Sequence, residues 1–141
     1  MSRRRSRPQP PAVTAASPCP CGTGASYADC CGRLHAGTAA APTAEALMRS
    51  RYTAFAVRDA GYLLRTWHPG TRPSEVDFDA GLRWVGLEIL DTAEGSAFHT
   101  TGTVTFRARY THDGQPGELH ERSRFVRHDG AWVYQDAVFT R

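Results

Sequence analysis

All the cysteines of this chain lie in one short stretch, CPCGTGASYADCC, which draws that part of the backbone toward one point. A disulfide between the adjacent residues Cys30 and Cys31 would be strained, and core cysteines would be spread along the chain. A tetrahedral metal ion instead needs four soft ligands gathered in one place. We therefore predict a metal site whose ligands are Cys19, Cys21, Cys30 and Cys31.

The residues between the cysteines indicate how the chain could bring the sulfurs together. Gly22 and Gly24 permit a tight turn and can aim backbone N–H groups at thiolates. Residues 25–30 predict a helical turn that returns Cys30 to the metal, and Gly32 is the predicted C-terminal cap. The chain is thus expected to form a compact knuckle around the ion.

Zinc is the predicted metal, and iron is the alternative, since four thiolates accept either ion. The spacing is not the C-x-x-C of redox proteins, and a closed four-sulfur site is chemically inert. His35 is expected to stabilise the position of the ligand residues without binding the metal in place of a cysteine.

The N-terminal segment is basic and rich in proline. Residues 1–18 predict a disordered arm, because they carry four arginines and no apolar run of export-signal length. The cytoplasm is therefore the default location, and no segment approaches the roughly 20 apolar residues of a membrane span. Outside this arm, 13 arginines stand against 14 acids, which argues against a nucleic-acid surface except through the arm itself.

Helix signals follow a linker over residues 35–42. Thr43 is the predicted N-cap of a helix over 44–58, in which apolar residues recur at helical spacing. Asp59 is the predicted cap of a shorter helix that follows.

Strand signals begin at residue 82, where the apolar period changes to two. Val85, Leu87 and Ile89 are expected on one face of the first strand, and Phe98 on the inward face of the second. Asp129-Gly130 predicts a hairpin turn. Helices followed by four strands with short connections predict an α+β fold, with the helices packed on a four-stranded antiparallel sheet.

One carboxylate falls on the apolar face of the third predicted strand. Glu121 alternates with Leu119 and Phe125, where an unpaired charge is costly. It could anchor an arginine or the Trp67-His68 turn, or it could form an acid–base pair with His68 in a cavity between sheet and helices. The candidate pocket residues are Arg49, Arg51, Tyr52, Trp67, His68, Glu121 and Tyr134.

The cysteine stretch resembles the SEC-C motif, named for the metal-binding tail of the SecA translocation ATPase. The segments CCGRLHAG, GTVTFRARY, LHERSRF and WVYQDA are similar to the YchJ family (UPF0225). The resemblance covers about residues 17–138 and implies a zinc-binding SEC-C segment followed by a nuclear transport factor 2-like cone. It implies no established activity, while the SecA tail, which contacts ribosomes and a chaperone, suggests an interaction role by analogy.

We expect three parts, namely the arm over 1–18, the SEC-C knuckle over 19–35 and the cone over 36–141. The predicted function is that of a non-catalytic metal-dependent adaptor. Tyr27 and Arg33 are expected to flank the surface that binds a protein partner linked to the ribosome or to secretion. The alternative is a small-ligand binder or enzyme that uses a cone pocket around Glu121 and His68. A cone interior packed solid would exclude that alternative.

Overall fold

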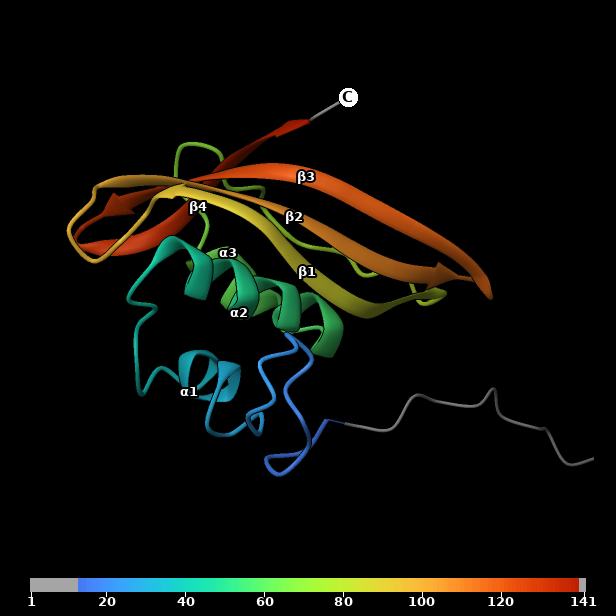
Figure 1. Ribbon diagram of the computed structural model, residues 1–141. Coiled ribbons are helices and arrows are strands. Elements are labelled where there is room, and N and C mark those ends of the chain that lie inside the picture. The colour runs from blue at the N-terminus through green and yellow to red at the C-terminus, as the bar shows by residue number, and fades with distance from the viewer. Residues whose placement is uncertain (1–12, 140–141) are drawn as a thin grey trace, which may run out of the picture.

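The computed structural model describes residues 13–139, so most of the predicted arm lies outside the described residues. The described chain forms three layers: the sheet, then α2 and α3, then α1 with the cysteine segment (Figure 1). The helices are α1 (Cys31–His35), α2 (Ala44–Val57) and α3 (Ala60–Arg65), and the strands are β1 (Leu82–Glu94), β2 (Thr101–His112), β3 (Gln115–His128) and β4 (Ala131–Phe139). This arrangement confirms the predicted α+β class.

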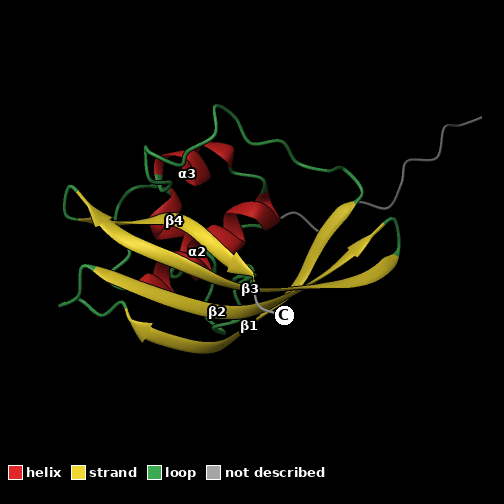
Figure 2. Cartoon of the chain, turned by 90° about the horizontal axis from the view of Figure 1, so that it is seen from above, coloured by secondary structure: helices red, strands yellow, loops and turns green. Residues whose placement is uncertain are grey.

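The sheet is a meander in which each strand pairs with the next in antiparallel register, in the order β1-β2-β3-β4. Two of its hairpins turn at Asp113-Gly114 and Asp129-Gly130, where both residues have positive φ, as in type I′ turns. Seen from above, the strands run across the view, α2 lies behind them, and α3 lies beyond the β4 edge (Figure 2). Helix α2 therefore covers one face of the sheet.

The two predicted helix caps are present. Thr43 Oγ1 accepts a hydrogen bond from Ala46 N at 3.1 Å, and Asp59 Oδ1 accepts one from Tyr62 N at 3.0 Å. Each cap satisfies a backbone N–H that the first turn of a helix leaves without an intrahelical partner.

Helix α2 is buried on two opposite sides. Leu47, Met48 and Tyr52 pack against the sheet in the main core. Ala54 belongs instead to a second apolar cluster, which it forms with Leu34 of α1 and with α3. Because α2 is the middle layer, it touches both the sheet and the cysteine segment.

The strands depart from the sequence prediction at two places. The pairing of β1 with β2 shifts register after Trp84, and this bulge leaves Val85 62% exposed while Leu87 and Ile89 pack against the core. The predicted inward position of Phe98 is wrong, because β2 begins only at Thr101. Phe98 lies in the β1–β2 loop and is 96% exposed.

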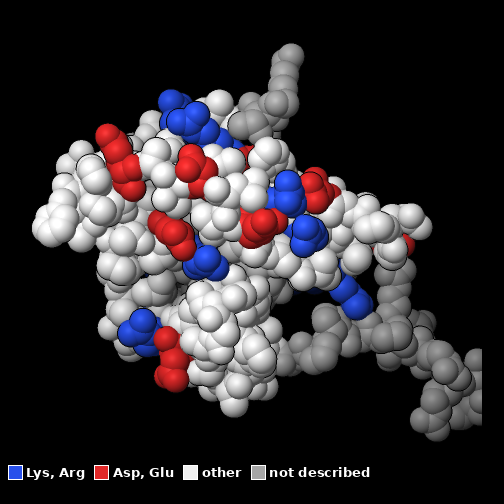
Figure 3. Space-filling model, viewed as in Figure 1, with Lys and Arg blue, Asp and Glu red and all other residues white. Residues whose placement is uncertain are grey.

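The described surface carries charges of both signs. In the view of Figure 3, arginines and acids are interspersed over the visible face. On the sheet, Arg107 pairs with Glu88 at 3.0 Å and with Glu118 at 3.1 Å. Among the described residues, no helix is long and apolar enough to cross a membrane.

Candidate metal centre and cone cavity

The four cysteine sulfurs converge on one point. All four Sγ atoms lie within 4.8 Å of one another, and the Sγ atoms of Cys21 and Cys30 are 3.5 Å apart. A tetrahedron with metal–sulfur bonds of about 2.3 Å has edges of about 3.8 Å. The sulfur positions therefore fit a four-coordinate metal ion with only small adjustments.

The first pair of cysteines is positioned by a tight turn that is closed by backbone hydrogen bonds. Cys19 N donates to Ala25 O at 2.9 Å, and Gly22 N donates to Cys19 O at 3.1 Å. Gly22 and Gly24 have φ values of 87° and 90°, a region that side-chain-bearing residues rarely adopt. These glycines are what allow the backbone to fold around the sulfurs.

The segment just before Cys19, which the sequence prediction assigns to the arm, makes backbone contacts with the knuckle. Pro18 forms an antiparallel bridge with Ser26, and Tyr27 N donates to Ser17 O at 2.7 Å. The residues just before Cys19 thus pair with the knuckle.

Cys30 and Cys31 can both direct their sulfurs to the same point because α1 begins between them. Cys30 is the non-helical N-cap, and Cys31 is the first residue of α1, so the two neighbouring side chains can turn toward one centre. The sequence prediction had a helical turn ending near Cys30, with Gly32 as its cap. Gly32 instead lies inside α1, where a Cβ atom would stand 2.5 Å from Tyr27 O. The glycine is needed for this close approach.

The pKa shifts of the cysteine thiols also favour a bound cation. Hydrogen bonds from the thiols of Cys21 and Cys31 lower the pKa of Cys19. Hydrogen bonding to Cys19 and to Cys21, and then burial, raise the pKa of Cys31. One thiolate is therefore stabilised only while its neighbours keep their protons. Four thiolates can share this buried space only when a metal ion supplies the compensating charge.

Threonine hydroxyls lie beside the sulfurs. Thr23 Oγ1 lies 3.2 Å from the sulfur of Cys30, and Thr53 Oγ1 of α2 lies 3.8 Å from that of Cys19. Neither was predicted from the sequence as part of the site. Thr53 could have been found as a small polar residue one turn after Ser50, on a helix whose other residues are apolar or charged.

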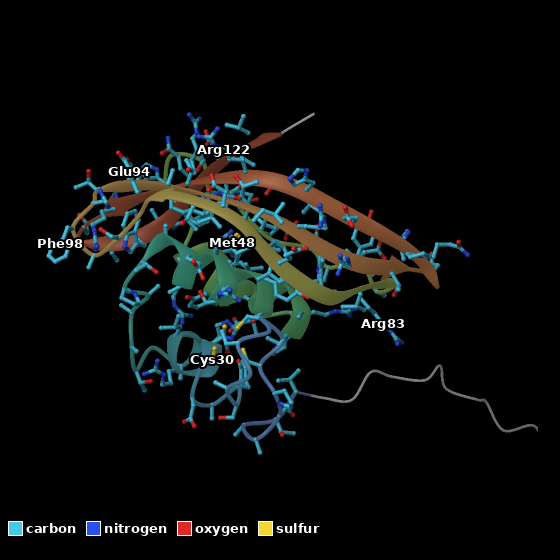
Figure 4. The ribbon with its side chains drawn as sticks, in the orientation of Figure 1. Cys30, Met48, Arg83, Glu94, Phe98 and Arg122 are labelled. Carbon is cyan, nitrogen blue, oxygen red and sulfur yellow. The ribbon has the colours of Figure 1, made fainter. Side chains whose placement is uncertain are left out.

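The knuckle is fastened to α2 by buried polar contacts. His35 Nε2 donates to Ser50 O at 2.9 Å, and its Nδ1 accepts from Tyr27 OH at 2.6 Å, which gives His35 a place behind the ligands. Arg49 Nη1 donates to Cys21 O at 2.9 Å. Figure 4 places Cys30 among the sulfur atoms on one side of α2, and Met48 on the other side, toward the sheet.

The two residues predicted to meet a partner differ in exposure. Tyr27 is half-buried, because its hydroxyl binds His35 and its backbone contacts Gly32, whereas Arg33 is exposed on α1.

A cavity of ≈ 220 Å³ lies between α2, the Trp67 segment and the sheet, so the cone is not packed solid. Five of the predicted pocket residues line it, namely Arg51, Tyr52, Trp67, Glu121 and Tyr134. Phe55, Trp84 and Ser123 also line it, although sequence analysis did not select them for the pocket. Ser123 could have been found from its alternation with Glu121 on β3.

Two predicted pocket residues lie elsewhere. Arg49 points to the knuckle and pairs with Glu45 at 3.0 Å. His68 is not part of the cavity lining; its Nδ1 accepts from Gly70 N at 2.9 Å, and its ring lies 5.2 Å from that of His128. The structure does not bring Glu121 and His68 together as an acid–base pair.

Glu121 gives the cavity wall a pH-dependent charge. Burial raises its pKa above the ordinary value of 4.5, although Ser123 Oγ donates to its Oε2 at 3.3 Å and partly offsets the shift. The folded state therefore binds more protons than the unfolded state between the ordinary pKa and the raised one. The free energy of unfolding must fall as pH rises through this window.

We expect Glu121→Gln to remove this contribution, so that the variant gains stability relative to the wild type as pH rises from about 4 to about 7. Urea denaturation across this pH range measures the difference. Glu75→Gln, at an exposed position, is the matched control and should track the wild type. A constant difference between wild type and Glu121→Gln at all pH values would contradict the prediction.

Comparison with known proteins yields two family matches. The family model described as YchJ, middle NTF2-like domain, matches residues 43–137, and the SEC-C motif matches residues 17–33. A UPF0225 protein of Streptomyces coelicolor is 72% identical over 86% of this chain and 95% of its own length. A UPF0225 protein of Deinococcus radiodurans is 52% identical, over 86% of this chain and 88% of its own length.

Two solved structures share the fold. The solution structure of a SEC-C motif containing protein from Rhodopseudomonas palustris has a TM-score of 0.76 and 36% identity, and the match covers 87% of this chain and 98% of that one. The crystal structure of a SEC-C motif containing protein from Psychrobacter arcticus has a TM-score of 0.73 and 26% identity, covering 90% and 85% of the two chains.

Proposed function

Because this chain belongs to the UPF0225 (YchJ-like) family, with a SEC-C motif and an NTF2-like middle domain, we propose that it is a zinc-dependent adaptor. The observation that carries the proposal is the convergence of four sulfurs within 4.8 Å. Four thiolates in a closed site hold zinc as a structural ion, with no open position for a substrate.

Elemental analysis of protein purified without added metal tests the identity of the ion. We expect about one zinc per chain, as in closed four-cysteine sites. Iron in that amount would overturn the zinc assignment and leave the four-sulfur site itself intact.

The adaptor role is supported by how the knuckle is divided between a buried and an exposed side. Cys19, Cys21 and Cys31 are buried toward α2, while residues 22–24 and Arg33 are exposed. A metal ion makes such a small surface rigid, so less conformational entropy is lost when a partner binds. We propose that the exposed side, centred on Arg33, contacts a protein of the ribosome.

Co-sedimentation of the full chain with purified ribosomes tests this role. We expect Arg33→Glu to reduce binding by about tenfold, because it reverses the charge at the centre of the contact. Arg122→Glu is the matched control, since Arg122 is exposed on β3, in the sheet layer (Figure 4). Equal binding of both variants and the wild type, or no binding of the wild type, would count against the adaptor role.

A further inference from the structure

The cone cavity has an aromatic wall and a buried cation. Its aromatic residues are Tyr52, Phe55, Trp67, Trp84, Phe106 and Tyr134. Arg51, from the middle of α2, lines the same cavity and is only 3% exposed. A buried charge is costly unless another group compensates it.

Within the described part of the chain, only one nitrogen of the Arg51 guanidinium has hydrogen-bond partners. Its Nη1 donates to Leu63 O at 2.8 Å and to Thr66 Oγ1 at 2.7 Å. Its central carbon lies 4.9 Å from the ring centroid of Trp67 and 4.7 Å from that of Tyr134. Among the described residues, no carboxylate lies within ion-pair distance of this cation, although Glu121 lines the same cavity. The arginine joins α2 to α3 through one nitrogen, and no carboxylate of residues 13–139 serves as its counter-ion.

We propose that the cavity binds a small monocarboxylate with an aromatic body, whose carboxylate pairs with Arg51. The aromatic walls would enclose the ring of the ligand. Guanidinium groups match carboxylates in both charge and geometry, and the low-polarity surroundings strengthen the pairing.

The charges that line the cavity favour a ligand with a singly charged anionic headgroup over an amine or a phosphate. An amine would place a second cation beside Arg51. A phosphate dianion would bring more negative charge than one arginine can neutralise. Arg51 stays cationic despite its burial, since desolvation lowers its pKa only to about 10, and burial raises the pKa of Glu121, which shifts this carboxyl toward its uncharged form.

The size of the cavity limits the ligand. A volume of ≈ 220 Å³ lies below the roughly 300 Å³ at which pockets for drug-sized molecules begin. A single ring with a short side chain suits this space.

Calorimetric titration of the full chain with three probes of the same shape tests the headgroup. The probes are phenylacetate, 2-phenylethanol and phenethylamine. We expect saturable binding of phenylacetate at one site, about tenfold weaker binding of the alcohol and weaker binding still of the amine. Absence of phenylacetate binding up to about 10 mM, or equal binding of the alcohol or amine, would overturn the proposal.

Two variants test the cation. Arg51→Met should weaken phenylacetate binding by about tenfold or more, while Arg49→Met, two residues away but facing the knuckle, should leave it unchanged. Since Arg51 also binds α3, circular dichroism checks that Arg51→Met is folded, and the comparison of the three probes in the wild type tests the headgroup without any substitution. Unchanged affinity in folded Arg51→Met would overturn the assignment. Zinc content, which the cavity variants should not change, separates this result from any failure of the adaptor proposal.

Discussion

Replacing Cys30 by serine is expected to release the metal while the sheet and α2 stay folded. Cys30 is the most exposed of the four ligands, so the change removes a thiolate with little loss of packing. The main core, built from α2 and the sheet, contains no cysteine, and the cysteines form a cluster of their own on the opposite side of α2. Metal loss should therefore unfold the knuckle first.

The expected cost in stability is about 4 kcal/mol, since loss of a structural metal is among the largest effects of a single substitution. The knuckle and α2 share the contact of Cys19 with Thr53 and that of His35 with Ser50, and unfolding of the knuckle would remove both. Zinc content should fall from about one per chain to nearly none. Elemental analysis, circular dichroism and urea denaturation measure the three quantities.

Thr23→Ala is the matched control for this experiment. It keeps all four sulfurs but removes the hydroxyl 3.2 Å from the Cys30 sulfur, so we expect metal affinity to fall by about ten- to a hundredfold with the ion still bound at saturation. Global unfolding of Cys30→Ser, with loss of the sheet signal, would show that the cone depends on the metal after all.

The metal ligands could be predicted because their geometry is local. Four cysteines close together in sequence, with Gly22 and Gly24 between them, leave the backbone few ways to fold. The caps Thr43 and Asp59 were equally local, since each bonds a backbone N–H three residues later. Such features need no knowledge of distant parts of the chain.

The cavity and the docking of the knuckle could not be predicted in full, because both depend on contacts between distant segments. His68 is next to Trp67 in sequence, yet the backbone bridge of Trp67 with Tyr134 leaves Trp67 on the cavity wall and His68 against His128. Arg49 and Arg51 look alike in sequence, but α2 directs one to the knuckle and the other to the cavity. A helix buried on two sides has no single apolar stripe to reveal this division.

Phe125→Ala is expected to produce a comparable loss of stability for a different reason. Phe125 is fully buried on β3 in the main core, and its ring centroid lies 5.9 Å from that of Tyr134. Removing the ring leaves a cavity in the main core, and the free energy of unfolding is expected to fall by about 3–5 kcal/mol. Urea denaturation should give this value.

Phe98→Ala is the matched control for Phe125→Ala, because the same atoms are removed from a side chain that is 96% exposed; the change should be within about 0.5 kcal/mol. Zinc content should stay at the wild-type level in both variants, since the main core and the cysteine cluster share only the half-buried Leu87 and no fully buried residue. A loss of zinc in Phe125→Ala under folded conditions would instead mean that α2 couples the two clusters. Stability of the cone and metal binding by the knuckle would then have to be treated as one cooperative unit.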